Sequence, residues 1–263
     1  MAIRVVVSGT GNMGREVLAG VARDADFEPV GVLEGLSSDT HVAVPGLGTL
    51  PISSDVPALL DRTKPDVIID FTNAEWTPQI AGPALERGVR LVIGTTGLPD
   101  AWLSSFDTSC RDRGVGAVIA ANFAIGAVLL IHFAKTASRF FDSAEIIELH
   151  HDRKVDAPSG TALTTAKEML AARGRPFDRN VPELTPLADT RGGQLDGLTI
   201  HSVRLPGFVA NQEVLFGGQG QTLSIRHDTT GRDAFIPGVL LAAREVMHRK
   251  ELVRGLDALF GLA

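Results

Sequence analysis

The sequence predicts an α/β protein in which a Rossmann-like, doubly wound parallel sheet is joined to a second α+β domain with a mixed sheet. Short β-branched runs alternate with amphipathic stretches over the first half. A Gly-rich turn directly follows the first of these runs. In the second half, strand-like runs follow one another without helices between them, which is typical of an antiparallel or mixed sheet.

In the first half, residues 3–8 predict a buried strand, and residues 16–23 predict the body of the helix after the Gly-rich turn. Further strands are expected at 29–34, 67–71, 90–93 and 115–120, and further helices at 77–87 and 100–113. Continuous apolar strands separated by helices indicate a parallel sheet covered on both faces.

In the second half, a helix is expected at 124–140, a strand at 145–150 and a helix from 159 to about 172. Residues 173–197 are rich in Gly, Pro, Arg and Asp and predict a long excursion. Strands are then expected at 198–204, 213–216 and 221–227, and a last helix near 234–250.

Composition excludes several function classes. The 25 basic and 31 acidic residues give a net charge of −6, which provides no electrostatic footprint for nucleic acid or anionic membrane. No stretch approaches the ~20 apolar residues that span a bilayer, and the first apolar run is too short for a signal peptide. We therefore expect a soluble, cytoplasmic protein.

Two residue counts narrow the chemistry further. The single cysteine, Cys110, excludes an internal disulfide and a Cys-rich zinc site, so we expect no metal. The chain has no Tyr, which excludes a phenolic proton donor and with it a short-chain dehydrogenase mechanism. A proton donor would have to be His or Lys.

Residues 9–14, Gly-Thr-Gly-Asn-Met-Gly, match the dinucleotide-binding pattern G-x-G-x-x-G. The motif follows a strand, opens a helix and is followed twenty residues later by Glu34, at the end of the next strand. Small residues let the backbone approach a pyrophosphate at the helix N-terminus. Glu34 would accept hydrogen bonds from ribose hydroxyls and repel a 2′-phosphate, so we expect NADH to be preferred, with NADPH possible.

Two further turns follow predicted strands. The turn at 94–97, Gly-Thr-Thr-Gly, and the segment 120–123, Ala-Ala-Asn-Phe, lie at strand carboxyl ends, where ligands bind in doubly wound sheets. Each could contact the nicotinamide half of a dinucleotide. An ordinary turn in the first case and a domain hinge in the second remain equally open from the residues alone.

Several residues with side chains capable of catalysis are clustered at the end of the predicted strand 145–150 and directly after it. His150, His151, Arg153 and Lys154 lie within five residues. Ser159 then predicts a helix N-cap that would leave the next amides free to bind a carboxylate. His can transfer a proton near neutral pH, and Lys can donate a proton or neutralise developing charge. Each residue alone has an ordinary structural explanation, but their combination favours a catalytic site.

Residues 150–162, His-His-Asp-Arg-Lys-Val-Asp-Ala-Pro-Ser-Gly-Thr-Ala, resemble the signature of the 4-hydroxy-tetrahydrodipicolinate reductase (dihydrodipicolinate reductase) family of lysine biosynthesis. The resemblance extends over almost the whole chain and includes segments 9–14, 70–72, 94–97, 121–123 and 203–207. It implies NAD(P)H-dependent reduction of a cyclic imine dicarboxylate to tetrahydrodipicolinate in the diaminopimelate route.

The resemblance also implies residue roles. His150 would be a proton donor or acceptor and Lys154 a proton donor. The substrate carboxylate would be bound by His151, Ser159, Gly160 and Thr161. The cofactor would contact Gly9, Thr10, Gly11, Asn12, Met13, Glu34, Gly94, Thr95, Thr96, Ala120, Ala121, Asn122 and Phe123. A homotetramer is implied, with residues 1–122 and 234–263 binding the dinucleotide and residues 123–233 binding substrate and oligomerising.

The sequence departs from the family at three places. The Gly-rich turn is one residue shorter than is common. Gly35 stands where Arg often follows the acidic residue, and Asn73 stands where some members carry a basic residue, which both favour NADH. The segment 211–213 replaces a more usual His-containing run. Two alternatives stay open: another NAD-dependent imine or amino-acid dehydrogenase on the same domain pair, and a non-catalytic dinucleotide sensor, against which His150 and Lys154 argue.

Overall fold

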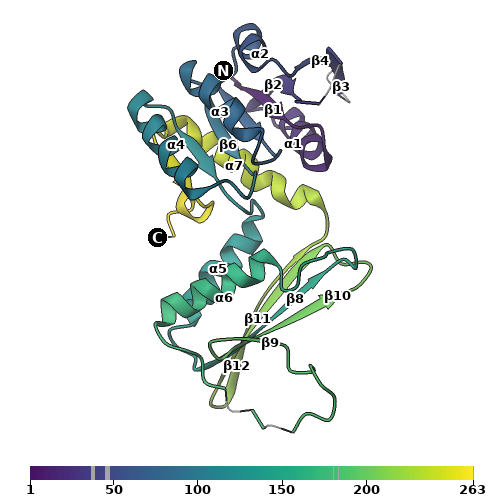
Figure 1. The fold of residues 1–263 in the computed structure, drawn as a ribbon, viewed down its shortest axis with the longest axis vertical. Helices are drawn as coiled ribbons and strands as arrows, with labels where there is room; N and C mark the ends of the chain where they lie inside the picture. The colour runs from purple at the N-terminus through teal and green to yellow at the C-terminus, as the bar shows by residue number, and fades with distance from the viewer. Residues whose placement is uncertain (37–38, 45–47, 180, 183, 263) are drawn as a thin grey trace. The chain divides into compact units, whose positions relative to one another are not determined.

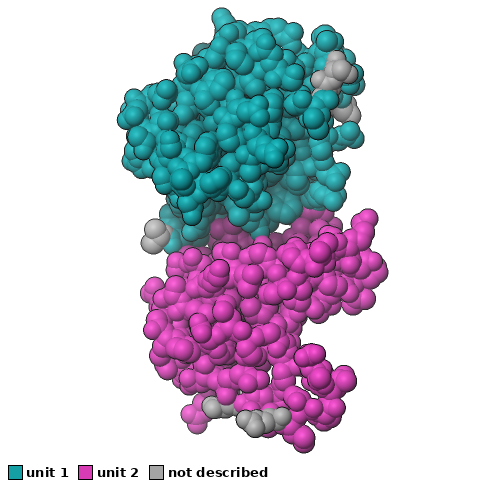
Figure 2. Space-filling model, viewed as in Figure 1, with its two compact units in different colours: residues 1–125, 232–263 teal, residues 126–231 magenta. Residues whose placement is uncertain are grey.

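The computed structural model describes residues 1–262 except 37–38, 45–47, 180 and 183. The chain folds into two compact units (Figures 1 and 2). Unit 1 contains residues 1–125 and 232–263, and unit 2 contains residues 126–231. Each unit has its own buried apolar core.

Unit 1 is built on an eight-stranded sheet in the order β13-β7-β6-β5-β1-β2-β4-β3. Its strands are β1 (Ile3–Ser8), β2 (Phe27–Leu33), β3 (His41–Val44), β4 (Gly48–Ser53), β5 (Val67–Asp70), β6 (Arg90–Ile93), β7 (Ala117–Ile119) and β13 (Leu252–Arg254). Every pairing is parallel except that of β3 with β4. The predicted Rossmann-like parallel sheet is therefore confirmed.

Five helices belong to unit 1 in the described part of the chain: α1 (Asn12–Arg23), α2 (Val56–Thr63), α3 (Thr77–Glu86), α4 (Asp100–Arg113) and α7 (Ile236–Glu245). Because helices cover the sheet, its central strands are apolar throughout, and Val5, Val6 and Val7 are at most 1% exposed. Local chemistry sets the helix ends: Asp55 caps α2 by accepting from the Ala58 amide.

The predicted helix body at 16–23 lies within α1, which begins at Asn12. Other elements of unit 1 differ from the sequence prediction. The predicted helix at 234–250 is instead α7 flanked by two short 3-10 turns, at Arg232–Phe235 and Val246–His248. Strands β3, β4 and β13 and helix α2 were not predicted. These are short elements whose formation depends on pairing or packing more than on local periodicity.

Unit 2 contains a five-stranded sheet in the order β12-β11-β8-β10-β9. Its strands are β8 (Ser143–His150), β9 (Gly193–Leu195), β10 (Leu198–Arg204), β11 (Ala210–Gly218) and β12 (Gln221–Thr229). Strands β8 and β10 are parallel and the other pairs antiparallel, which confirms the predicted mixed sheet. The predicted excursion at 173–197 contains β9.

Two helices, α5 (Ile125–Ala137) and α6 (Gly160–Arg173), pack against one face of this sheet (Figure 1). Helix α5 ends three residues earlier than the predicted 140. Side chains alternate between the two faces of a strand, so β8 buries Ala144, Ile146 and Glu148 on the helix-covered side. Glu148 is thus a charged residue at a core position, directly preceding the candidate catalytic segment.

Candidate active site

The Gly-rich loop of unit 1 is tightly folded between β1 and α1. Gly9 has a φ of +97°, which favours glycine, and its amide donates to the Leu33 carbonyl at 2.8 Å. A Cβ atom on Gly14 would overlap the Gly9 carbonyl oxygen, so the helix requires glycine there. A Cβ on Gly11 would meet nothing within 4 Å. Gly11 also precedes α1 without a side-chain cap, so the loop offers open space and amides to an anion.

Glu34 follows β2 beside this loop. Its Oε2 atom accepts hydrogen bonds from the Thr10 amide at 2.8 Å and from the Thr10 hydroxyl at 2.6 Å. Burial acts to raise the pKa of Glu34, but the bonds from Thr10 and from the Leu36 amide outweigh it and lower the pKa below 4.5. The carboxylate is therefore ionised. Its Oε1 atom accepts a long 3.4 Å bond from the Leu36 amide and retains capacity for a hydroxyl donor.

Asp70, at the carboxyl end of β5, organises the neighbouring turns. Its fully buried carboxylate accepts from the hydroxyls of Thr72 at 2.6 Å, Thr77 at 2.5 Å and Thr95 at 3.2 Å. The Thr95 hydroxyl also accepts from the Thr72 amide at 3.2 Å. The Thr95 side chain, expected to contact cofactor, is thus 4% exposed and already bonded within the protein, whereas Thr96 beside it is exposed.

The turn after β7 packs on the same edge of the sheet. Phe123 is 1% exposed, and its ring lies 5.4 Å from that of Phe71, centroid to centroid. The Asn122 side chain accepts from the Ala124 amide at 2.8 Å. Segments 9–14, 34, 94–97 and 120–123 follow β1, β2, β6 and β7, which run parallel, so unit 1 brings the expected cofactor residues to one edge of its sheet.

In unit 2, His150 is the last residue of β8, and its imidazole contacts the side chain of Glu148. The His150 Nδ1 atom lies 2.5 Å from Oε2 of Glu148, which has no exposed surface. Arg204 binds Glu148 with two hydrogen bonds, from Nη2 to Oε1 at 2.7 Å and from Nη1 to Oε2 at 3.0 Å. Neither Glu148 nor Arg204 was predicted as a site residue. The period-two alternation of β8 places Glu148 on the same face as His150, but the strand pattern alone does not indicate that a charged residue there is buried.

The protonation of this cluster follows from its surroundings. Burial lowers the pKa of His150 below 6.5, the charges of Lys154 and Arg204 lower it further, and Glu148 opposes them. Burial acts to raise the pKa of Glu148, but hydrogen bonds from Arg204, Ser202 and His150 outweigh it and lower the pKa below 4.5. Glu148 is therefore ionised at neutral pH beside an imidazole that gives up its proton readily.

Lys154 lies in the turn between β8 and α6. Its Nζ atom is 2.7 Å and 3.0 Å from the two carboxylate oxygens of Asp156. The Lys154 side chain is 22% exposed and that of Asp156 is 58% exposed, so the ion pair is at the surface. The Lys154 amide also donates to the His151 carbonyl at 3.2 Å, which closes the turn.

Helix α6 begins with the N-cap that the sequence predicts. The Ser159 hydroxyl, in a residue 2% exposed, accepts from the Ala162 amide at 3.2 Å and caps the helix. Gly160 is exposed, and a Cβ atom there would meet nothing within 4 Å. The buried Nδ1 atom of His151 has no hydrogen-bond partner among the described residues. Unit 2 thus places an imidazole, a cation and a helix N-terminus on one continuous segment.

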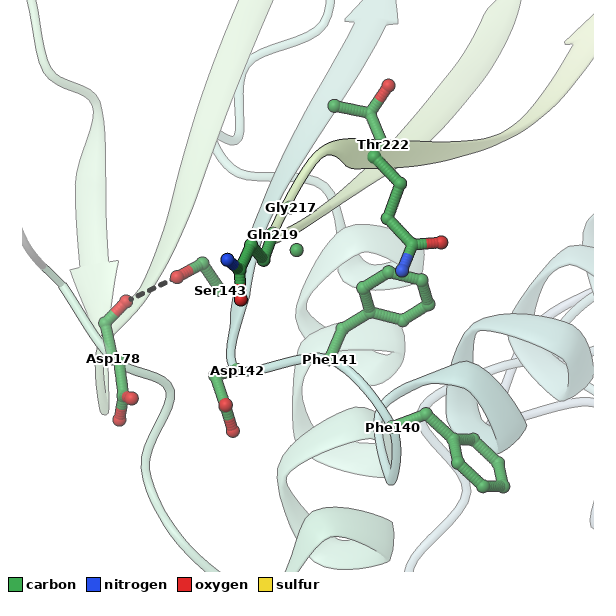
Figure 3. A pocket seen from close by; sticks show the side chains of 10 residues that line it. Phe140, Phe141, Asp142, Ser143, Asp178, Gly217, Gln219 and Thr222 are labelled. Carbon is green, nitrogen blue, oxygen red and sulfur yellow. Dashed lines mark hydrogen bonds between the residues drawn. The ribbon is translucent and has the colours of Figure 1, made fainter.

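A pocket of about 800 Å³ opens elsewhere on unit 2, at the other end of β8 (Figure 3). Its lining includes Phe141, Asp142, Ser143 and Asp178, and the Ser143 hydroxyl donates to the Asp178 carbonyl at 3.1 Å. Ser143 and His150 are the two ends of β8, roughly 23 Å apart along an eight-residue strand. The pocket lining includes none of the sequence-predicted site residues.

Neither a metal site nor a membrane span is found within the described ranges. No group of three or more His, Cys, Asp or Glu residues there could hold a metal ion. None of the helices described is long and apolar enough to cross a membrane.

Comparison with known proteins gives matches over both units. The family model "Dihydrodipicolinate reductase, N-terminus" matches residues 3–123, and "Dihydrodipicolinate reductase, C-terminus" matches residues 126–260. A 4-hydroxy-tetrahydrodipicolinate reductase of Dehalococcoides mccartyi strain CBDB1 is 47% identical over 262 residues, covering 99% of each chain. That of Moorella thermoacetica is also 47% identical, covering 98% of this chain and 97% of the relative.

Solved structures agree with these matches. A dipicolinate-bound dihydrodipicolinate reductase from Paenisporosarcina sp. TG-14 superposes with a TM-score of 0.90 at 39% identity, covering 98% of this chain and 99% of that one. An amine dehydrogenase from Mycobacterium smegmatis has a TM-score of 0.67 at 15% identity and covers 98% of this chain and 96% of that one, a likeness of fold alone.

Proposed function

Because this chain belongs to the dihydrodipicolinate reductase family, we propose that the segment from His150 to Thr161 carries out the family's reduction on a dicarboxylate substrate. The enzyme is an NAD(P)H-dependent oxidoreductase of the diaminopimelate route to lysine. It converts 4-hydroxy-tetrahydrodipicolinate to tetrahydrodipicolinate by way of dihydrodipicolinate: loss of water gives dihydrodipicolinate, and reduction of one double bond then gives the product.

The Gly-rich loop fits a dinucleotide. The open position at Gly11 leaves room for a pyrophosphate against the backbone, and the ionised Glu34 offers Oε1 to a ribose hydroxyl. When bound, the reduced nicotinamide supplies a hydride to the substrate ring. The protein's own residues then have to bind the substrate carboxylates, orient the ring and supply one proton, so that hydride and proton together saturate one double bond.

His150 and Lys154 are proposed to supply that proton and to neutralise charge. The His150 Nδ1 atom faces Glu148, which leaves Nε2 to exchange a proton with substrate. The Lys154 ammonium neutralises a developing negative charge or donates a proton. The amides of Gly160 and Thr161, with Ser159 and His151, hold a carboxylate at the N-terminus of α6. The dipicolinate bound to the Paenisporosarcina reductase is a ligand of that class.

One observation carries the proposal: β8 ends in an imidazole held by a buried carboxylate, and Lys154 and the α6 N-terminus follow within eleven residues. The test couples the purified protein to the synthase that makes the substrate and follows oxidation of the nicotinamide cofactor. We expect oxidation that requires both proteins. No oxidation with either cofactor would contradict the proposal, while turnover of other imines or amino acids would favour the alternative dehydrogenase. Cofactor binding without turnover would favour a sensor.

For the cofactor we propose a preference for NADH. The Glu34 carboxylate is held ionised by Thr10, and a 2′-phosphate beside it would be repelled. The next residue, Gly35, contributes no cation to offset that repulsion. The preference is tested by measuring the dissociation constants of NADH and NADPH at low ionic strength, because salt screens the repulsion. We expect the NADH constant to be the lower. Tighter binding of NADPH under those conditions would overturn this preference.

For the assembly we propose a homotetramer in which unit 2 binds substrate and provides the subunit contacts, while unit 1 binds the dinucleotide. On the sheet face of unit 2 away from α5 and α6, the half-buried apolar side chains of Ile147, Leu149, Val203 and Leu215 come from three adjacent strands. Such a face is suited to association with further copies. Light scattering should give about four times the chain mass of 27.8 kDa. We also propose a cytoplasmic location, in keeping with a biosynthetic, pyridine-nucleotide-dependent family, which cell fractionation would test.

A further inference from the structure

We propose that Glu148 and Arg204 are positioning residues for this reaction, Glu148 by fixing His150 and Arg204 by linking Glu148 to the loop that carries Lys154. The inference rests on the proposed role of His150 in proton transfer. Both residues act through others and are not proposed to touch the substrate.

Both carboxylate oxygens of Glu148 are occupied. The Oε2 atom lies 2.5 Å from His150 Nδ1 and accepts from Arg204 Nη1 at 3.0 Å, and the Oε1 atom accepts from Arg204 Nη2 at 2.7 Å. A carboxylate facing Nδ1 keeps the proton on that nitrogen and fixes the ring orientation. The Nε2 atom is then the one left to exchange a proton with substrate.

Arg204 joins two parts of the site. Strands β8 and β10 are parallel and in a register that places Arg204 opposite His150. Besides its two bonds to Glu148, the guanidinium donates from Nη2 to the backbone carbonyl of Asp156 at 2.7 Å. Asp156 lies two residues after Lys154 in the turn between β8 and α6. A single rigid, planar group therefore holds the strand that presents His150 and the turn that presents Lys154.

Because the ion pair between Glu148 and Arg204 is buried, stabilisation of the fold is not sufficient to explain it. Glu148 has no exposed surface, and the Arg204 side chain is 18% exposed. The attraction of a buried ion pair is largely offset by the cost of removing both charges from water, so an apolar pair could replace it without loss of stability. A fixed geometry beside a proton-transfer group is what such a pair provides and an apolar pair does not.

The same strand carries a matched comparison. Glu145 Oε2 lies 2.8 Å from His201 Nε2, so a second Glu–His pair exists on β8 and β10. It lies on the opposite face of the sheet, because Glu145 and Glu148 are an odd number of residues apart, and Glu145 is 47% exposed. Glu145→Gln therefore removes a similar contact without touching the His150 cluster.

The charged groups that face His150 are Glu148 on β8, Arg204 on β10 and Lys154 in the following turn. On β11 its register partner is Ala210, which carries no charge. Glu148 is the group among them that favours the imidazolium. Replacing it with Gln should move the pH at which activity is lost on the alkaline side to a lower value, if protonated His150 is the active form.

The test measures kcat, KM and cofactor Kd for Glu148→Gln, His150→Gln and the double variant, with Glu145→Gln as the control. We expect Glu148→Gln to lower kcat by about 10- to 100-fold, a typical cost of losing a group that orients a functional ligand, and to leave the NADH Kd unchanged. Its pH profile should shift to lower pH. In the His150→Gln background, Glu148→Gln should have no further effect. Glu145→Gln should leave kcat, KM and the pH profile unchanged. Because Glu145 lies on the sheet face proposed for subunit contacts, the mass of this variant in solution is measured as well.

The outcomes separate the two proposals. An active His150→Gln variant would remove the proposed role of His150. The proposal for Glu148 would be overturned, and that for His150 kept, if His150→Gln is slow but Glu148→Gln has a normal rate and a normal pH profile. An equal loss of kcat from Glu148→Gln in the unmodified enzyme and in the His150→Gln variant would also overturn the role of Glu148, since a merely structural residue gives additive losses. If Glu148→Gln does not fold, Arg204→Lys keeps the charge but not the geometry of the hydrogen bonds to Glu148 and Asp156, and it should lower kcat with an unchanged NADH Kd. A normal kcat in Arg204→Lys would overturn the role of Arg204.

Discussion

The Nζ atom of Lys154 lies 2.7 Å from Oδ1 of Asp156, two residues further along the same turn. A second contact of 3.0 Å, to Oδ2, makes the pair bidentate. The ammonium proposed to serve an anionic substrate is therefore bound to a carboxylate of the protein itself. A substrate carboxylate that approaches Lys154 has to compete with Asp156 or accept its negative charge nearby.

Removing that charge by Asp156→Asn should lower the substrate KM several-fold, because the competing anion is lost. The free energy of unfolding should change by less than about 1 kcal/mol, since Asp156 is 58% exposed and surface ion pairs contribute little. Steady-state kinetics and thermal melting measure both effects. Asp152→Asn, in the same turn and with the same charge change at an exposed residue, is the matched control. An equal fall in KM in both variants would show a general charge effect instead.

Lys154→Ala should lower kcat by about 10²- to 10⁴-fold, the usual contribution of a positioned acid. The Kd for NADH should be unaffected, because the expected cofactor residues belong to unit 1. Stopped-flow measurement of a single turnover would show the loss in the chemical step. A turnover rate close to that of the unmodified enzyme would rule out Lys154 as the acid.

Two partly buried imidazoles predict how stability depends on pH. Burial lowers the pKa of His150 and of His227 below 6.5, and the ring of His227 packs so closely on Gly126 that a Cβ atom there would overlap it. The unfolded chain takes up protons as the pH falls through 6.5, while the folded chain does so only at lower pH. The stability that these groups contribute above pH 6.5 is therefore lost as the pH falls through their folded pKa values. The loss is about 1.4 kcal/mol for each pH unit that separates the folded pKa from the unfolded one.

Melting temperatures between pH 7.5 and pH 5.5 check this. The melting temperature should decrease towards pH 5.5, and the decrease should be smaller for His227→Gln. His41→Gln alters an exposed imidazole and should reproduce the original slope. A His227→Gln variant with an unchanged slope would count against burial of a neutral ring as the cause.

The parts of the fold that the sequence predicts well are those whose pattern is local. Strand β1 and the Gly-rich turn are examples. Strand β4 was missed because Gly48 and Pro51 within it are poor strand formers, and β13 because its three residues depend on pairing with β7. The predicted helix body at 16–23 lies within α1, which begins inside the Gly-rich motif, where only glycine fits at position 14 against the Gly9 carbonyl.

The same distinction applies to the site. His150 and Lys154 could be predicted because they are neighbours in sequence. Glu148 could not, because a charged residue in a strand usually faces solvent. It is buried here because Arg204, 56 residues away, is brought opposite by the parallel pairing of β8 and β10. That pairing is a tertiary contact which no local pattern encodes.

Glu34→Gln should weaken NADH binding by about tenfold, because a ribose hydroxyl loses a charged acceptor. NADPH binding should weaken less or improve, because the repulsion of a 2′-phosphate is removed as well. The ratio of the two dissociation constants is therefore expected to move towards NADPH. Fluorescence titration at low salt measures it, with Glu28→Gln, a surface carboxylate on the strand that precedes Glu34, as the control. If the ratio of the NADH and NADPH dissociation constants stays constant, Glu34 does not contact the ribose.

Gly11 and Gly14, two of the three glycines of the Gly-rich loop, should fail in different ways when replaced. In Gly14→Ala the new methyl group would overlap the Gly9 carbonyl oxygen, so the loop or the helix must shift and the melting temperature should fall. In Gly11→Ala the methyl group meets nothing, and Gly11 has a φ of −68° that alanine adopts freely, so the melting temperature should be unchanged. The Kd for NADH should nevertheless rise by about tenfold or more, because the methyl group occupies the space that a pyrophosphate needs against the backbone. Melting and titration on both variants separate the two roles, and normal NADH binding by Gly11→Ala would show that the pyrophosphate lies elsewhere.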